Sequence, residues 1–233
     1  MAHGGDWCHI RSMSNVLVVG ASRGIGYEFV RQYRNDGHDV TATVRDSAGL
    51  ARVRGLGAHA FMLDVTDADC ASILMAHLQG RTFDVALVCA GVGSRLDALD
   101  PPTASEFELV MRTNVLGPMR ALKPIADALS PGAKLALLSS QMGSIESRHE
   151  SSRWLYRASK AALNSIVKDT SLALGGRAIC ISIHPGWVRT DMGGVNADIS
   201  VLDSVAGMRK VIAALDAEDT GTFRDHKGAS IAW

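Results

Sequence analysis

The chain of 233 residues has no excess charge of either sign, because 24 lysines and arginines balance 24 aspartates and glutamates. No run of like charges offers a local patch, so neither nucleic acid nor an anionic membrane surface is an expected partner. The four cysteines lie far apart without a CxxC pair, which argues against a disulfide framework and a thiolate zinc site. No apolar stretch reaches the ~18 residues that a membrane-spanning helix needs, so no span is expected.

What is present is ordinary for a globular protein, since 47% hydrophobic and 21% charged residues can bury a core without metals or disulfides. Residues 1–12 have neither periodicity nor the apolar stretch of a secretory signal, so we expect a disordered extension before one folded domain of residues 13–233. The same features favour a cytoplasmic location. The histidines show no i, i+4 spacing, and no metal is expected.

Short apolar runs alternate with segments of helical period along the chain. The expected strands are 16–19, 40–44, 58–63, 85–88, 134–138 and 178–183, and the expected helices are 25–33, 73–78, 106–129, 156–174 and 200–214. Most strand runs are nearly continuous in apolar residues, as in strands covered on both faces. We therefore predict an α/β fold, a single-domain Rossmann-type doubly wound parallel sheet with helices on both faces. The third helix is expected to bend at Gly117, Pro118 and Pro124.

A glycine-rich turn joins the first expected strand to the first expected helix, with Gly20, Gly24 and Gly26 in a GxxxGxG pattern. Glycines let the backbone approach a pyrophosphate closely, and the N-terminus of the helix supplies free N–H groups. The alternative is a tight strand-to-helix turn without a ligand. The pattern alone therefore indicates a dinucleotide site without establishing it.

Two further segments carry groups that could take part in catalysis. Tyr156 and Lys160 are four residues apart on an expected helix, so they share a face, and the ammonium is expected to lower the pKa of the phenol. Ser139 and Ser140 follow the strand expected at 134–138, at the edge of the sheet where open α/β folds bind ligands. A tuned tyrosine can act as a general acid or base, and a serine can donate to a carbonyl oxygen. Taken singly, a surface pair and a capping serine explain these residues better.

In this order the three segments resemble the short-chain dehydrogenase/reductase family, and the resemblance covers residues 13–233. The segments SSQMGSI, YRASKAALN and HPGWV, with Trp233, resemble its C-factor-like carbonyl reductase subgroup. The resemblance implies hydride transfer between a nicotinamide and a carbonyl or alcohol carbon. The catalytic residues that it implies are Ser140, Tyr156, Lys160 and Asn114. The cofactor-binding residues that it implies are Gly20, Ser22, Arg23, Gly24, Ile25, Gly26, Arg45, Asp64, Val65, Ala90, Gly91, Tyr156, Lys160, Pro185, Gly186, Val188 and Thr190.

The chain departs from the family pattern at Val88 and Cys89, where the family has two asparagines. In the family those asparagines support the geometry of the loop after the strand. Their replacement is therefore expected to affect the local stability of this loop more than catalysis. The register of the motif favours Ser140 over Ser139 as the catalytic serine. Asn114 is expected to place a water molecule behind Lys160 for a proton relay.

The choice of cofactor depends on the end of the second expected strand. NAD needs a carboxylate there for the ribose 2′-hydroxyl, whereas the 2′-phosphate of NADP needs a cation. Arg45 follows this strand and Arg23 lies in the glycine turn, so two guanidinium groups can hold a phosphate. Asp46 is an acidic residue that would favour NAD, although it lies one residue past the position that binds the ribose 2′-hydroxyl. We therefore predict NADP(H).

Two other functions share the glycine turn. A non-catalytic nucleotide-binding protein with a signalling or regulatory role keeps the fold without the reaction, and a methyltransferase gives no reason for Tyr156 and Lys160. The expected substrate is a small carbonyl or alcohol, whose identity the sequence does not give.

A lid over the substrate pocket is expected at residues 191–200. Five side chains are candidate pocket walls and equally candidates for ordinary packing: Gln141, Met142, Trp154, Trp187 and Met192.

The helices expected at 106–129 and 156–174 carry apolar residues around more of their circumference than one buried stripe requires. Burying such surfaces favours association, and a twofold interface would bring the same helices of two subunits together. We therefore expect a homodimer or homotetramer built on these helices. The alternative is a monomer in which loops cover both faces.

Overall fold

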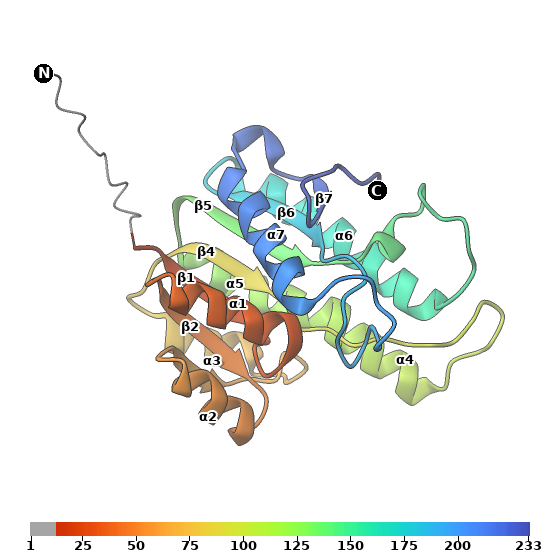
Figure 1. Cartoon of the computed structure of the whole chain (residues 1–233), viewed down its shortest axis with the longest axis horizontal. Coiled ribbons are helices and arrows are strands. Elements are labelled where there is room, and N and C mark those ends of the chain that lie inside the picture. The colour runs from red at the N-terminus through yellow and green to blue at the C-terminus, as the bar shows by residue number, and fades with distance from the viewer. Residues whose placement is uncertain (1–12) are drawn as a thin grey trace, which may run out of the picture.

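Seven parallel strands form one sheet in the order β3-β2-β1-β4-β5-β6-β7 (Figure 1). The computed structural model describes residues 13–233, so the expected extension of residues 1–12 lies outside the described residues. The strands are β1 (Asn15–Val19), β2 (Asp39–Val44), β3 (His59–Met62), β4 (Phe83–Val88), β5 (Leu129–Leu138), β6 (Ile179–His184) and β7 (Phe223–Asp225). The predicted doubly wound parallel sheet is thus confirmed, and β7 is a seventh strand that the sequence analysis missed.

Helices cover both faces of the sheet, and each face has its own apolar core. Alternate residues of β1 point to opposite faces, so Val16 and Val18 belong to one core while Leu17 and Val19 belong to the other. The first core packs α1 (Gly24–Asn35), α2 (Ser47–Gly55) and α7 (Val201–Ala214) on the sheet. The second core packs α3 (Cys70–Leu78), α5 (Gly117–Asp127) and α6 (Trp154–Leu174). Each fully buried Leu or Phe contributes about 1.5–3 kcal/mol to this arrangement.

The segment expected as one bent helix over 106–129 is divided differently. It comprises α4 (Ala104–Met111), a π turn η1 (Arg112–Leu116) and α5, while Leu129 already belongs to β5. The interruption therefore precedes Gly117 and Pro118, and Pro118 stands in the first turn of α5, directly after the π turn. The π turn turns Asn114 into the interior, where its exposed fraction is 0%.

Local capping explains several helix boundaries. Ser200 caps α7 by accepting a hydrogen bond from Asp203 N, and Gly175 ends α6 in the left-handed conformation. The helix α2 was not expected, because Gly49 and Val53 are its only two buried residues and leave no apolar stripe to detect. Asp46 caps α2 by accepting from Gly49 N.

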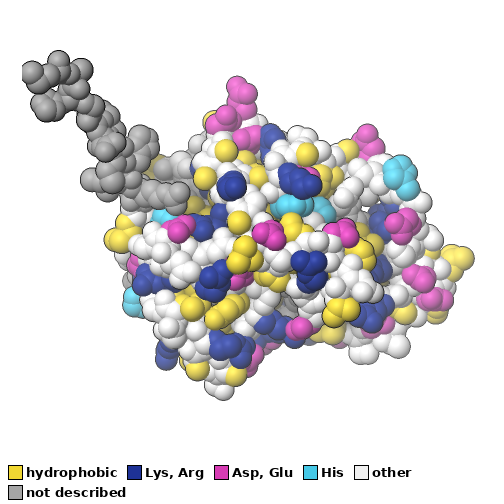
Figure 2. Space-filling model, in the orientation of Figure 1, with side chains coloured by type: hydrophobic (Ala, Val, Ile, Leu, Met, Phe, Trp, Pro, Cys, Tyr) yellow, Lys and Arg dark blue, Asp and Glu magenta, His cyan; other side chains and the backbone are white. Residues whose placement is uncertain are grey.

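The outer surface carries charges of both signs. On the face shown in Figure 2, basic and acidic side chains are interspersed and do not gather into one patch of a single sign. None of the helices within residues 13–233 combines the length and the apolar character needed to cross a membrane.

Candidate active site

The glycine turn closes tightly between β1 and α1. A Cβ at Gly26 would lie 2.1 Å from the Gly20 carbonyl oxygen, so only glycine allows the helix to start this close to the strand. The helix begins at Gly24, and Arg23 caps it without a side-chain hydrogen bond. The first N–H groups of α1 therefore have no side-chain cap and are placed to bind an anion. Ile25, by contrast, packs against the core beneath the turn.

A groove runs from this turn along the carboxyl ends of β1 to β4. It is lined by Gly20, Ser22, Arg23, Thr43, Arg45, Leu63, Asp64, Val65, Cys89, Ala90, Gly91 and Thr113. Eight of the predicted cofactor residues are thus brought together, whereas Gly24, Ile25 and Gly26 do not line the groove. Thr43, Leu63, Cys89 and Thr113 were missed, although Leu63 and Cys89 adjoin the predicted residues Asp64 and Ala90 after their strands. Asp64 is fixed there by accepting hydrogen bonds from the amide and the hydroxyl of Thr66, each at 2.8 Å.

The cationic corner of the groove has a defined arrangement. The Ser22 hydroxyl accepts a hydrogen bond from Arg45 N at 2.9 Å, which ties the end of β2 to the glycine turn. Asp46 caps α2 through Oδ1, which accepts a hydrogen bond from Gly49 N at 2.6 Å. Arg23 instead forms a 2.7 Å ion pair with Asp191, across the groove. The two side chains are 68% and 76% exposed, so this ion pair is weak and open to exchange.

The segment after β6 approaches the glycine turn at Thr190 and Asp191. Its start is fixed by the Ser204 hydroxyl, which donates to the Pro185 carbonyl at 2.6 Å, and Gly186 follows with a φ of 85°. Val188 is buried and pairs with Ile199. The Thr190 methyl group would be 3.8 Å from a Cβ at Gly24. Of the predicted residues after β6, Thr190 therefore approaches Gly24 of the turn, whereas Val188 pairs with Ile199.

Two neighbouring serines at the end of β5 have different surroundings. The Ser139 hydroxyl is buried and donates to Asn164 Oδ1 at 2.6 Å, in a polar cluster that Ser182 shares. The Ser140 hydroxyl lies near the Tyr156 phenol, whose pKa it acts to lower, and it accepts from Met142 N at 3.2 Å. Of the two serines, it is Ser140 that meets the tyrosine, in agreement with the register of the motif.

Tyr156 and Lys160 are both buried on α6, but the ammonium does not act on the phenol as expected. Burial raises the pKa of Tyr156, and a hydrogen bond from Ser140 and the charge of Arg153 only partly oppose this rise. The Lys160 Nζ donates to the Leu138 carbonyl at 2.8 Å and lies 5.8 Å from the centre of the Tyr156 ring. The expected lowering of the tyrosine pKa by Lys160 is therefore wrong for this structure, because desolvation dominates.

Burial also lowers the pKa of Lys160, to about 8. The nearby Cys89 acts in the opposite direction and raises this pKa. Asn114 Oδ1 and Lys160 Nζ both face Gly91, at 3.4 and 3.5 Å from where a Cβ would stand. The Asn114 amide nitrogen donates to the Val92 carbonyl and to the Ser159 hydroxyl, and its oxygen accepts from Val92 N. Because both amide protons are used, the Asn114 side chain secures the loop after β4, and its part in a water relay stays a prediction.

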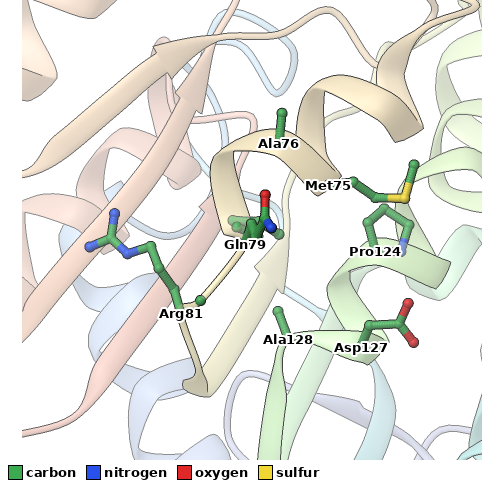
Figure 3. A pocket seen from close by; sticks show the side chains of 9 residues that line it. Met75, Ala76, Gln79, Arg81, Pro124, Asp127 and Ala128 are labelled. Carbon is green, nitrogen blue, oxygen red and sulfur yellow. The ribbon is translucent and has the colours of Figure 1, made fainter.

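A second hollow lies far from this groove, at the ends of α3 and α5 that precede β4 and β5 (Figure 3). Its lining includes Met75, Gln79, Arg81, Pro124 and Asp127. It opens at the amino-terminal edge of the sheet, whereas ligands of open α/β sheets bind at the carboxyl edge. Within residues 13–233, no group of three His, Cys, Asp or Glu side chains is placed to hold a metal ion.

Comparison with known proteins agrees with this geometry. Residues 20–222 match the family model described as enoyl-(acyl carrier protein) reductase. The C-signal protein of Myxococcus xanthus is 37% identical over 153 residues, which cover 64% of this chain and 92% of that protein. The 1-hydroxy-2-glutathionyl-2-methyl-3-butene dehydrogenase of Rhodococcus sp. (strain AD45) is 32% identical over 232 residues, covering 95% of this chain and 100% of that protein.

Solved structures give the same result. A carbonyl reductase from Pseudomonas aeruginosa PAO1 in complex with NADP has a TM-score of 0.82 at 32% identity, covering 95% of this chain and 100% of that chain. An NADPH-bound carbonyl reductase from chicken fatty liver has a TM-score of 0.83 at 29% identity, covering 95% and 99%. The resemblance inferred from the sequence is confirmed, and the chain belongs to the short-chain dehydrogenase/reductase family.

Proposed function

We propose that the chain is an NADP(H)-dependent oxidoreductase that transfers hydride between the nicotinamide and a carbonyl or alcohol carbon of a small molecule. The observation that carries the proposal is the meeting of Ser140, Tyr156 and Lys160 beside a groove lined by the glycine turn. The cofactor supplies the hydride when it is bound, and the protein supplies the position and the proton. Among the relatives, the structures described as carbonyl reductases with NADP or NADPH support this assignment.

Tyr156 is the proposed general acid in the direction of carbonyl reduction. Because burial raises its pKa, the phenol holds its proton at neutral pH and can give it to the oxygen of the substrate. Ser140 is placed beside the phenol and would donate a hydrogen bond to the same oxygen. Lys160, whose ammonium faces Gly91, would bind the hydroxyl groups of the nicotinamide ribose. Asn114 secures the loop that contains Gly91 and Val92.

The residues around the groove fit NADP(H) better than NAD(H). Arg45 and Arg23 bring two guanidinium groups to the groove, and Asp46 is engaged as a helix cap. A phosphate that binds there would form charge-assisted hydrogen bonds with both arginines, and the one to Arg23 would replace the exposed Asp191 contact. The site residues inferred from the resemblance remain proposals for this chain.

A homodimer or homotetramer is proposed through the outer faces of α4, α5 and α6. Exposed apolar side chains on these helices, and on η1 between α4 and α5, include Phe107, Leu109, Leu116, Met119 and Leu172. Burying them in a twofold interface would remove this surface from water. Light scattering at micromolar concentration tests this, since a mass of 24.7 kDa with full activity contradicts it. A cytoplasmic location and the absence of nucleic-acid partners stay proposals that rest on composition.

The experiment that tests the reaction is NADPH oxidation against a panel of aldehydes, ketones and quinones, with identification of the alcohol product. We expect turnover of at least one substrate class and a strong preference for NADPH over NADH. The alternative, a nucleotide-binding protein with a signalling role, predicts cofactor binding without turnover of any carbonyl. The intact set of Ser140, Tyr156 and Lys160 favours the enzyme.

A further inference from the structure

Three hydrogen-bond donors converge on the main-chain oxygen of Trp233, close to the candidate active site. Ile145 N donates to it at 3.0 Å, Glu146 N at 3.2 Å and the Ser144 hydroxyl at 3.3 Å. These donors come from the loop that follows Ser140, about ninety residues earlier in the chain. The loop between β5 and α6 is thus attached to the part of the chain beyond β7.

The attached residues are connected to Ser140 by one short, rigid turn. The 3₁₀ helix η2 (Gln141–Gly143) begins at Ser140, whose side chain caps it by accepting from Met142 N. Gly143 N donates to the Ser140 carbonyl at 2.7 Å, and Ser144 N donates to the Gln141 carbonyl at 3.0 Å. A displacement of Ser144 would therefore be passed on to the serine at the other end of the turn.

The other side of η2 packs directly on the helix that carries Tyr156 and Lys160. A Cβ at Gly143 would lie 2.8 Å from the Lys160 carbonyl carbon, so the turn and α6 are in close backbone contact. Ser144 is completely buried at this junction. The position of η2 consequently sets the distance between Ser140 and the Tyr156 phenol.

Trp233 is itself fixed to the sheet. Its ring stacks on Phe223 of β7, with ring centres 5.7 Å apart and an angle of 23° between the planes. Phe223 is 1% exposed, and its carbonyl accepts a hydrogen bond from Ile231 N at 2.8 Å. Figure 1 places the C-terminal end of the chain beside β7. The oxygen of Trp233 is therefore a fixed point to which the loop after Ser140 is tied.

We propose that Trp233 is a positioning residue for the candidate active site: its main-chain oxygen holds Ser144, Ile145 and Glu146, and thereby holds the Ser140 hydroxyl against the Tyr156 phenol. The proposal rests on the proposed function for its effect on turnover. Its effect on the geometry of Ser140 and Tyr156 can be measured without any turnover. The cofactor groove along β1 to β4 is built from other residues, so cofactor binding is separable from this positioning.

A matched pair of variants removes one of the three donors. Ile145→Pro deletes the amide that binds Trp233, whereas Ile145→Ala keeps the amide and trims a side chain that is 68% exposed. Ser144 has a ψ of 124°, which the residue before a proline favours. We expect Ile145→Pro to lower kcat by about fivefold or more, as the loss of one hydrogen bond allows, with the Kd for NADPH within about twofold of wild type. Ile145→Ala should behave as wild type.

A second pair tests the anchor from the other side. Trp233→Ala keeps the main-chain oxygen and removes the ring that stacks on Phe223, whereas Trp233→Phe keeps an aromatic ring. Trp233→Ala should lower kcat as Ile145→Pro does, and Trp233→Phe should not. This pair carries the test if Ile145→Pro does not fold.

A spectroscopic readout separates positioning from turnover. The chain has three tyrosines, so ¹³Cζ-tyrosine NMR gives three signals, of which Tyr156 is assigned with Tyr156→Phe. Ile145→Pro should move the Tyr156 signal and leave those of Tyr27 and Tyr33 in place. An unmoved Tyr156 signal overturns the proposal, and so does a parallel loss of kcat, cofactor affinity and Tm. If the wild type reduces no carbonyl but the Tyr156 signal moves, the positioning stands and the proposed reaction fails.

Discussion

Replacing Lys160 by methionine should change how the stability of the protein depends on pH. Burial lowers the pKa of Lys160 to about 8, from an ordinary value of 10.5. Between these two pH values the unfolded chain holds a proton on this lysine that the folded chain has released. Because the unfolded state then binds more protons, the free energy of unfolding of the wild type rises with pH through this window. The Lys160→Met variant lacks this rise.

The expected size follows from the same two pKa values. Their separation corresponds to about 3 kcal/mol, which is the cost of keeping the buried ammonium charged below pH 8. Relative to Lys160→Met, the wild type should therefore gain most of about 3 kcal/mol between pH 7 and pH 10. The variant also leaves the Leu138 carbonyl without its lysine partner, which costs about 1–3 kcal/mol. That loss lowers the free energy of unfolding of the variant by the same amount at every pH. It therefore does not change how the difference between the two proteins varies with pH.

Urea unfolding of both proteins at several pH values between 7 and 10 measures this difference directly. Lys123→Met is the matched control, because the Lys123 side chain is 78% exposed and its ion pair with Asp127 lies at the surface. For the control the difference from wild type should not depend on pH. A difference between wild type and Lys160→Met that stays constant across the window would refute the assignment of a buried, desolvated ammonium to this site.

Three further predictions concern the groove and the serines. Arg45→Ala should weaken NADPH binding about tenfold or more while NADH binding changes little, which fluorescence titration measures; equal losses would contradict the phosphate role. Asp191→Asn should free Arg23 and tighten NADPH binding by less than about fivefold, an effect that added salt reduces; weaker binding would contradict it. Ser140→Ala should lower kcat about 10²-fold with Tm retained, whereas Ser139→Ala should lower Tm and retain kcat; the opposite pattern in steady-state and melting measurements would exchange the two roles.

The fold was predictable because its strands are short, continuous apolar runs bounded by helices of clear period. The elements that were missed lack that signal. Helix α2 buries only Gly49 and Val53, and β7 has three residues. The π turn at Asn114 also has no sequence signature, since Gly117 and Pro118 draw the expected interruption a few residues too far along the chain.

The candidate site was predictable as a set of positions but not as a set of contacts. Helical spacing places Tyr156 and Lys160 on one face of α6, yet the ammonium donates to the Leu138 carbonyl at the end of β5. The sequence likewise does not reveal that Asp46 caps a helix or that Asn164 takes the Ser139 hydroxyl. Such partners depend on tertiary packing, which local sequence patterns do not encode.

The central claim is that Tyr156 gives its proton to a carbonyl oxygen as hydride is transferred. It is tested most directly by measuring NADPH-dependent carbonyl turnover and the Kd for NADPH side by side in the wild type and in Tyr156→Phe. The phenol is buried and holds its proton, so its removal should cost about 10²–10⁴-fold in kcat and change the Kd by less than about twofold. Near-wild-type turnover in Tyr156→Phe would contradict the account.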